Sequence, residues 1–372
     1  MPDAPETNRN QRLTLVVTGS IAAIKTIPLI SALSERCHEV TVILTRAPEQ
    51  WEWVSGDAAK AATGHAVITH TDNIQTKANA IMASRTILIA PASADFISQL
   101  AHASSELAHK ILEAQRHGSK LILAPAMNYK MWQHPTVQRN CATLAASNIT
   151  ILGPVKGIMA CGDNGYGRMI EVSEMASGVQ AALAGIQHPS ASHYDAARHD
   201  GMKEIPFRPT ETGARILIAL TDGGASLNAL NMLVFAIDRA RLTAEYIVDP
   251  HWAKRRAILE GMTKKTIVSD HFQLPDLEGL EHIKLPERAR CVFFPFLDKT
   301  LAEKMVQGQA DTLCLSTYLA SKTPIVTTAA CLQNLPPALA KSLCHDGVLG
   351  IERYNDLAQI LPPQQFLNCT PR

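Results

Sequence analysis

One local pattern recurs along this chain. A short run of apolar, β-branched residues ends in a small or Gly-containing turn, and a helix with apolar periodicity follows. Runs that are apolar throughout are typical of buried strands in parallel sheets, and their alternation with helices predicts a doubly wound parallel α/β fold. In the first half of the chain such strands are expected at residues 13–17, 39–44, 85–89, 121–124 and 150–152, and one long helix is expected over residues 96–116.

Length and charge narrow the possible classes of protein. A chain of 372 residues is long enough for two domains. Its 35 basic side chains are balanced by 34 acidic ones, so nothing favours nucleic acid or an anionic membrane surface as a partner. Residues 1–11 are polar and predict a disordered tail rather than a signal peptide.

The remaining composition favours a cytoplasmic protein with reduced thiols. No apolar run reaches the roughly 18 residues that a membrane span needs. The eight cysteines lack the close pairing that is typical of metal sites, so no metal is expected.

The second half repeats the rhythm of the first. Residues 215–221 form an apolar run that enters a Gly turn, and Phe294-Pro295 ends an expected strand as Ala90-Pro91 does in the first half. The number of positions between corresponding residues of the two halves is almost constant. Any two doubly wound domains share such a rhythm, but the constant offset favours a diverged internal duplication. We therefore expect one domain at residues 12–187, a linker at 188–213 and a diverged second domain at 214–372.

Two turns of the first domain suit a phosphate. Thr18-Gly19-Ser20 connects a strand to a helix, where backbone N–H groups and the helix N-terminus favour an anion. Ser93 follows the third strand, where its hydroxyl could contact a ligand or cap the next helix. Both roles are open to this one side chain.

The stretch from residue 120 to 171 carries two further motifs. Asn128 follows an apolar strand within Pro125-Ala126-Met127-Asn128, a place where open α/β sheets bind ligands. Cys161 lies among Gly, Asp and Asn residues, which predicts a mobile loop that carries a thiol. Taken alone, Asn128 could be a turn residue and Cys161 an inert thiol.

Together these motifs resemble the flavin-dependent cysteine decarboxylases. The Pro-Ala-Met-Asn-x-x-Met-Trp run, the Ala-Cys-Gly-Asp run and four shorter stretches occur in the family's order over about residues 11–186. The resemblance implies two tandem Rossmann-like flavoprotein domains and FMN as the cofactor. The FMN-binding residues implied by the resemblance are Gly19, Ser20, Ile21, Thr45, Ser93, Ala94 and Met127.

The resemblance also implies roles for the reactive side chains. Asn128 would hold the substrate carboxylate, and Cys161 would return a proton while its loop closes over the substrate. The family further needs a His in a His-Ile-x-Leu pattern before the third strand, where this chain has Lys77. Lys is a poor substitute for a near-neutral base, because its unperturbed pKa is about 10.4 against about 6.5 for His. His65 and His70 stand too early in the sequence to match the pattern.

The second half carries the missing pattern at His282-Ile283-Lys284-Leu285 but has Ala330-Cys331-Leu332 in place of the Met-Asn pair. Each half therefore retains what the other lacks. Since the family's active sites lie between subunits, the resemblance implies a composite site of Asn128, Cys161 and His282. A surface or capping role is the alternative for His282.

Three functions remain open at this point. The first is FMN-dependent decarboxylation of a cysteine-type carboxylate, with 4′-phosphopantothenoylcysteine of coenzyme A biosynthesis as the expected small-molecule substrate. The second is oxidative decarboxylation of a C-terminal peptide Cys, and the third is an inactive flavoprotein that regulates a partner. A homo-oligomer whose active sites lie at domain interfaces is expected, with neither nucleic acid nor a membrane as partner.

Overall fold

The computed structural model describes residues 12–36, 39–184, 215–221, 227–269 and 280–359. By its internal packing the chain divides into two compact units. The first comprises Met1–Gln133 and Val137–Gly201, and the second comprises His134–Thr136 and Met202–Arg372. The expected tail at 1–11 and the expected linker at 188–213 lie outside the described residues.

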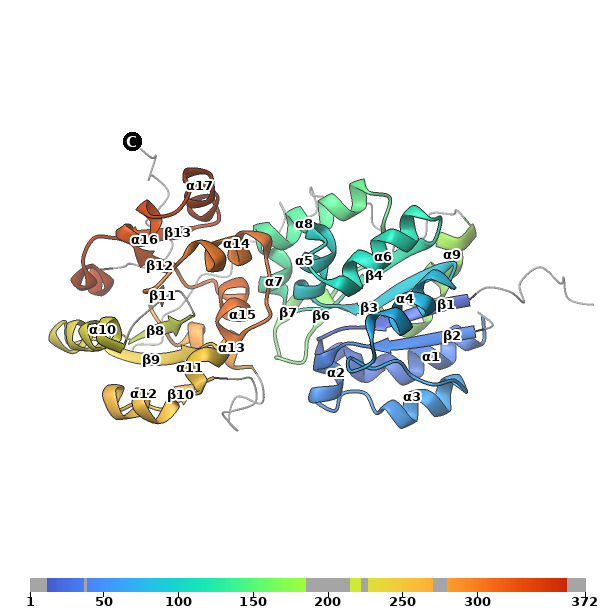
Figure 1. Ribbon diagram of the computed structural model, residues 1–372, viewed down its shortest axis with the longest axis horizontal. Coiled ribbons are helices and arrows are strands. Elements are labelled where there is room, and N and C mark those ends of the chain that lie inside the picture. The colour runs from blue at the N-terminus through green and yellow to red at the C-terminus, as the bar shows by residue number, and fades with distance from the viewer. Residues whose placement is uncertain (1–11, 37–38, 185–214, 222–226, 270–279, 360–372) are drawn as a thin grey trace, which may run out of the picture. The chain divides into compact units, whose positions relative to one another are not determined.

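The first unit is built on a parallel five-stranded sheet with the order β2-β1-β3-β4-β5 (Figure 1). Leu13, Leu15 and Val17 of β1 face a core that includes side chains of α1 and α9. Thr14, on the other face, shares a hydrogen bond of 2.7 Å with Ser84, which follows α4. Helices thus cover both faces, as a doubly wound sheet requires. The strands are β1 (Arg12–Val17), β2 (Glu39–Leu44), β3 (Thr86–Ala92), β4 (Lys120–Pro125) and β5 (Thr150–Ile151).

Helices alternate with these strands, and a hairpin extends the end of the unit. The 3₁₀ helix η2 (Ile21–Lys25) leads directly into α1, and an antiparallel pair, β6 and β7, precedes α9. The elements are α1 (Thr26–Ser34), α2 (Arg46–Gln50), α3 (Gly56–Thr63), α4 (Ile74–Met82), α5 (Ala94–His102), α6 (Glu106–Arg116), α7 (Tyr129–Gln133), α8 (Pro135–Ala146), β6 (Val155–Ile158), β7 (Asn164–Arg168) and α9 (Val172–Ala184).

The expectation of one helix over residues 96–116 is wrong. Ala103 has φ 49°, in the left-handed region that ends a helix, and α5 stops before it. Ser105 then begins α6, because its hydroxyl accepts a hydrogen bond of 3.2 Å from the N–H of Ala108. Such a cap contributes about 1 kcal/mol, enough to fix a new helix start.

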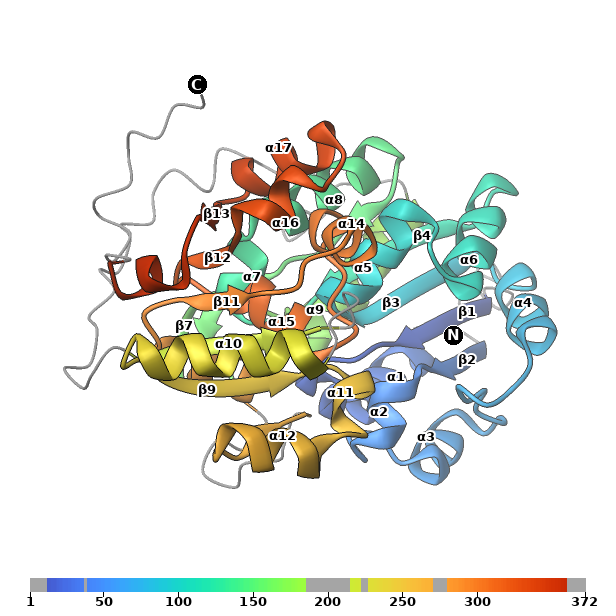
Figure 2. The ribbon, with the colours of Figure 1, turned by 60° about the vertical axis from the view of Figure 1, so that its left-hand side comes forward.

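The second unit has a parallel six-stranded sheet with the order β10-β9-β8-β11-β12-β13 (Figure 1). Figure 2 shows α10 (Leu227–Arg239) running alongside β9. Without β10 this order matches β2-β1-β3-β4-β5 strand for strand in chain order. The predicted fold class, two doubly wound parallel-sheet domains in tandem, is therefore confirmed. The strands are β8 (Arg215–Leu220), β9 (Thr243–Val248), β10 (Ile267–Val268), β11 (Val292–Phe294), β12 (Ile325–Thr328) and β13 (Val348–Ile351).

The helices of the second unit flank this sheet, and none described in either unit is long and apolar enough to cross a membrane. They are α10 (Leu227–Arg239), α11 (Pro250–Ala253), α12 (Arg256–Thr263), α13 (Glu281–Glu287), α14 (Lys299–Gln307), α15 (Leu313–Ala320), α16 (Ala329–Gln333), α17 (Pro337–His345) and η4 (Tyr354–Gln359).

The two units share local contacts as well as the order of their strands. The hydroxyl of Thr18 donates to the carbonyl of Pro91, and that of Thr221 donates to the carbonyl of Phe296. Even the isolated bridge between Ile43 and Ile68 beside β2 has a counterpart in the pairing of β9 with β10. The two units thus share these local contacts in addition to the order of their strands.

Candidate active site

Three turns of the first unit meet at the edge formed by the carboxyl ends of its strands. Thr18 follows β1, Ser93 follows β3 and Asn128 follows β4, and β1, β3 and β4 are consecutive neighbours in the sheet. Open parallel sheets bind ligands at this edge.

Thr18 fixes the first two turns to each other. Its buried hydroxyl donates to the carbonyl of Pro91 at 2.7 Å and accepts from the N–H of Ser93 at 2.8 Å. Loss of this buried hydroxyl would leave the N–H of Ser93 without its partner, at about 1–3 kcal/mol, whereas the carbonyl of Pro91 would still accept from the N–H of Thr18. Thr18 thereby sets the spacing of the Gly19-Ser20 turn and the start of α5.

The expected cofactor residues form a narrow cradle around this point. A Cβ atom at Gly19 would lie 2.9 Å from the Cβ of Ala47, so only Gly fits there. The Ser20 hydroxyl accepts from the N–H of Ala22 at 3.4 Å, and Ile21 begins η2 with 41% of its surface exposed. Thr45 closes the cradle, since its hydroxyl and its N–H both donate to the carbonyl of Val17.

Ser93 caps α5, because its hydroxyl accepts from the N–H of Phe96 at 3.2 Å. The capping role is therefore present, and it leaves the hydroxyl's own proton available for a ligand. Ala94, the next residue, is buried as the first residue of α5. The cradle thus combines backbone N–H donors, a tight turn and the N-termini of helices, a combination that suits the binding of a phosphate group.

Asn128 has a fixed side-chain orientation. Its Oδ1 atom accepts from the N–H of Lys130 at 2.8 Å, so its amide nitrogen must point the other way. That nitrogen, Nδ2, donates to Cys161 Sγ at 3.1 Å and to Asp163 Oδ2 at 2.9 Å. Only 8% of the Asn128 surface is exposed. The structure thus brings Asn128 and Cys161 together, although 33 positions separate them.

The hairpin of β6 and β7 carries Cys161 to this place. The N–H of Met127 donates to the carbonyl of Gly167 at 3.0 Å. A Cβ atom at Gly167 would lie 2.3 Å from the carbonyl oxygen of Met127, and one at Gly165 would lie 2.8 Å from Tyr129 Cβ. These two glycines therefore allow β7 to lie directly against the start of α7.

Cys161 lies at the tip of the hairpin as a protonated thiol. Burial raises the pKa of the Cys161 thiol, and the carboxylate of Asp163 raises it further. Hydrogen bonds from the Asp163 backbone and from the Asn128 side chain act in the opposite direction and lower the pKa. Since the net shift is upward, the thiol keeps its proton at neutral pH, as a proton donor must.

Lys77, His65 and His70 of the first unit have no hydrogen bond to Asn128 among those described. Lys77 Nζ donates to the carbonyls of His70 and Asp72 at 2.9 and 2.7 Å, so it anchors a loop. The His70 ring pairs with Glu49, and His65 is exposed. Ile68, which lies between His65 and His70 in the sequence, pairs with Ile43 on the outer edge of β2. From there the sheet continues through β1 and β3 to β4, which Asn128 follows. Ile68 and β4 are therefore separated by four strand spacings, roughly 19 Å.

His282 lies on α13 of the second unit and is half-buried. In the repeated topology α13 precedes β11 as α4 precedes β3, so His282 stands in the place that Lys77 occupies in the first unit.

The carboxyl edge of the second sheet has different chemistry. Asp298 caps α14, where its carboxylate accepts from the N–H of Leu301 at 2.8 Å, in the place that Ser93 takes before α5. Cys331 follows β12 in the place of Asn128. A fixed negative charge at this cap opposes a phosphate. No sequence pattern distinguishes Asp298 as a residue of this edge, because Asp and Ser are equally good helix caps.

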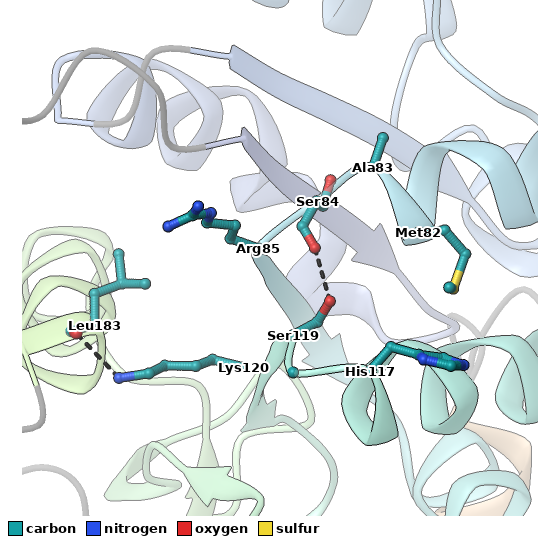
Figure 3. A pocket seen from close by; sticks show the side chains of 9 residues that line it. Met82, Ala83, Ser84, Arg85, His117, Ser119, Lys120 and Leu183 are labelled. Atoms are coloured by element: carbon teal, nitrogen blue, oxygen red, sulfur yellow. Dashed lines mark hydrogen bonds between the residues drawn. The ribbon is translucent and has the colours of Figure 1, made fainter.

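A cavity of about 520 Å³ opens at the opposite edge of the first sheet (Figure 3). Arg85, His117 and Lys120 line it, at the amino ends of β3 and β4. Lys120 Nζ donates to the carbonyls of Ala182 and Leu183, at the end of α9. Cations are favoured at helix C-termini, so Lys120 has a structural role here. The cavity lies away from the Asn128 edge and carries none of its chemistry.

Comparison with known proteins identifies the same part of the chain. Residues 2–184 match the family described as Flavoprotein. The "Coenzyme A biosynthesis bifunctional protein CoaBC" of Haemophilus influenzae is 38% identical over 167 residues, which are 43% of this chain and 40% of that protein. The protein of the same name from Escherichia coli is 32% identical over 177 residues, again 43% and 40%. The chain thus spans about two fifths of the curated relatives it matches.

Solved structures also align with this half. A Cys-to-Ser variant of a PPC decarboxylase with pantothenoylaminoethenethiol is 27% identical, with a TM-score of 0.41, and the match covers 47% of this chain and 100% of that one. The FMN-binding protein AtHal3 is 27% identical, with the same TM-score, over 48% and 100%.

Proposed function

Residues 2–184 belong to the flavoprotein family, and from that premise we propose that this chain is an FMN-dependent decarboxylase of a cysteine-type carboxylate. The substrate we propose is 4′-phosphopantothenoylcysteine, because the curated relatives are coenzyme A biosynthesis proteins. The observation that carries the proposal is the joint hydrogen bonding of Asn128 with Cys161 and Asp163 beside the cradle at Gly19. A regulatory flavoprotein has no need of a proton-bearing thiol held against an amide donor.

The cradle residues fit FMN without a dinucleotide fingerprint. Gly19, Ser20 and Thr18 form one short turn, and Ser93 supplies a hydroxyl at the neighbouring strand end. When bound there, FMN would supply the two-electron oxidation that makes the substrate's carboxylate a leaving group and would return the two electrons as a hydride after carbon dioxide has left.

The chain's own side chains then position the substrate and move a proton. Asn128 Nδ2 donates to the substrate carboxylate, since its Oδ1 is held by the backbone of α7. Cys161 Sγ holds a proton and returns it to the substrate carbon after carbon dioxide has left. The hairpin of β6 and β7 covers this position and limits the access of water.

The first prediction concerns the cofactor and its amount. The purified full chain should release FMN on denaturation, at one molecule per chain, because Asp298 replaces the Ser93 hydroxyl in the second unit. Mass spectrometry and absorbance of the released flavin measure both quantities. Recovery of FAD or NAD would refute the assignment, and two FMN molecules per chain would refute the role given to Asp298.

The second prediction is that Asn128→Asp abolishes decarboxylation and leaves FMN bound. The new carboxylate would face the substrate carboxylate at close range, where like charges repel by several kcal/mol. Carbon dioxide release from 4′-phosphopantothenoylcysteine measures the loss, which should exceed about 100-fold. Asn79→Asp on the exposed face of α4 is the matched control. Equal turnover by both variants would place the reaction elsewhere.

We further propose that His282 is the histidine of this reaction, on the basis of its place on α13 and the loop-anchoring contacts of Lys77. His282→Asn should then lower turnover of the FMN-loaded full chain by at least about tenfold, in the range that general acid–base groups contribute. Lys77→Met should leave kcat unchanged. The reverse ranking of the two variants would remove His282 from the mechanism.

A further inference from the structure

Asp163 makes a contact that the proposed reaction does not use. Its Oδ2 atom accepts from Asn128 Nδ2 at 2.9 Å, the shorter of the two hydrogen bonds that this nitrogen donates. The same oxygen lies 3.5 Å from Cys161 Sγ, so one carboxylate oxygen touches both reactive side chains. An Asn amide nitrogen carries two N–H groups, and here one points to a thiol and the other to a carboxylate.

The Asn128 amide cannot turn to offer another donor. Its Oδ1 atom is held by the N–H of Lys130 at 2.8 Å within a side chain that is almost fully buried. A ligand carboxylate that binds Nδ2 while Cys161 keeps its own contact with that nitrogen must therefore take the position of the Asp163 carboxylate. Both carboxylates cannot remain there, because two negative charges at close range repel each other strongly in a partly desolvated site.

The position of Asp163 at the hairpin tip allows it to leave. Asp163 and Cys161 are half-buried, in contrast to Gly165 and Gly167, which are buried against α7. The tip is closed mainly on itself, by bonds from the N–H of Met159 to the carbonyl of Asp163 and from the N–H of Gly162 to the carbonyl of Met159. The tip can thus shift while the base of the hairpin stays fixed to Met127.

We propose that Asp163 is an internal occupant of the carboxylate subsite, which holds the place of the substrate carboxylate on Asn128 until the substrate displaces it. The inference rests on the proposed function, since it takes Asn128 as the carboxylate-binding residue. Asp163 then selects for ligands whose carboxylate can replace it, and its departure frees the Cys161 thiol from the carboxylate that lies against it.

The test compares two ligands that cannot react as the substrate does. 4′-Phosphopantothenoylserine carries the carboxylate but a hydroxyl in place of the thiol, and 4′-phosphopantetheine lacks the carboxylate. Their dissociation constants are measured by calorimetry on the FMN-loaded full chain, for the unchanged protein, Asp163→Ala, Asp163→Asn and the exposed-carboxylate control Asp57→Ala.

Asp163→Ala should bind the serine ligand about tenfold more tightly, which corresponds to about 1.4 kcal/mol. Asp163→Asn should shift in the same direction, because the charge is gone. Neither variant should change the affinity for 4′-phosphopantetheine, and Asp57→Ala should change neither affinity. Cys161 should also react faster with iodoacetamide in both Asp163 variants, which residue-resolved mass spectrometry detects without any turnover.

Unchanged or weaker binding of the serine ligand by Asp163→Ala would overturn the inference while leaving the proposed function intact. Equal gains for both ligands would also overturn it, since the carboxylate would not be the group that competes. If no form of the protein binds either ligand, the proposed substrate class is wrong. The role of Asp163 in holding the place of the substrate carboxylate is then wrong as well.

Discussion

The side-chain amide of Asn128 is the contact on which the arrangement of this site depends. Its oxygen is fixed by the backbone of α7, and its nitrogen reaches the hairpin tip at Cys161 and Asp163. The start of α7 and the hairpin tip, which both follow β4 in the sequence, are thereby tied at one point. Because the amide is buried, loss of any partner would leave a polar group unsatisfied, at about 1–3 kcal/mol.

Two backbone constraints make this contact possible. Gly167 lets β7 approach Met127 more closely than any residue with a Cβ atom could. On the other side of the edge, the buried Thr18 hydroxyl joins the turns after β1 and β3. The first constraint places the thiol, and the second shapes the cradle proposed for phosphate. Both act at the carboxyl ends of neighbouring strands, so cofactor and substrate sites become adjacent.

Much of this was accessible from the sequence. The apolar run at 39–44 coincides with β2 (Glu39–Leu44), and the resemblance singled out Asn128 and Cys161, which the structure joins. The break at Ala103 was missed, since a left-handed residue inside an apolar-periodic run leaves no compositional mark. The contact of Asp163 with Asn128 was also missed, because a pattern of residues gives order along the chain but not which side chains meet.

The second unit shows why a repeat does not imply a repeated function. Strand order and the Thr221 contact are kept, because they maintain the sheet. The residues at its ligand edge differ: Asp298 stands for Ser93, and Cys331 stands for Asn128. A fold is maintained by its core, whereas a binding site depends on a few side chains at the strand ends. The sequence pattern was enough to identify Cys331 as a difference between the two halves. Asp298 was identified only from its hydrogen bond at the start of α14.

The central claim is that Asn128 and Cys161 act on one substrate in successive steps. The mass of the product that FMN-loaded Cys161→Ser forms from 4′-phosphopantothenoylcysteine tests it most directly. The account predicts a product that has lost carbon dioxide and also lacks two hydrogen atoms relative to the 4′-phosphopantetheine formed by the unchanged protein, because oxidation and decarboxylation proceed without the final transfer of a hydride and a proton. Full conversion of the substrate to 4′-phosphopantetheine by Cys161→Ser would contradict the account.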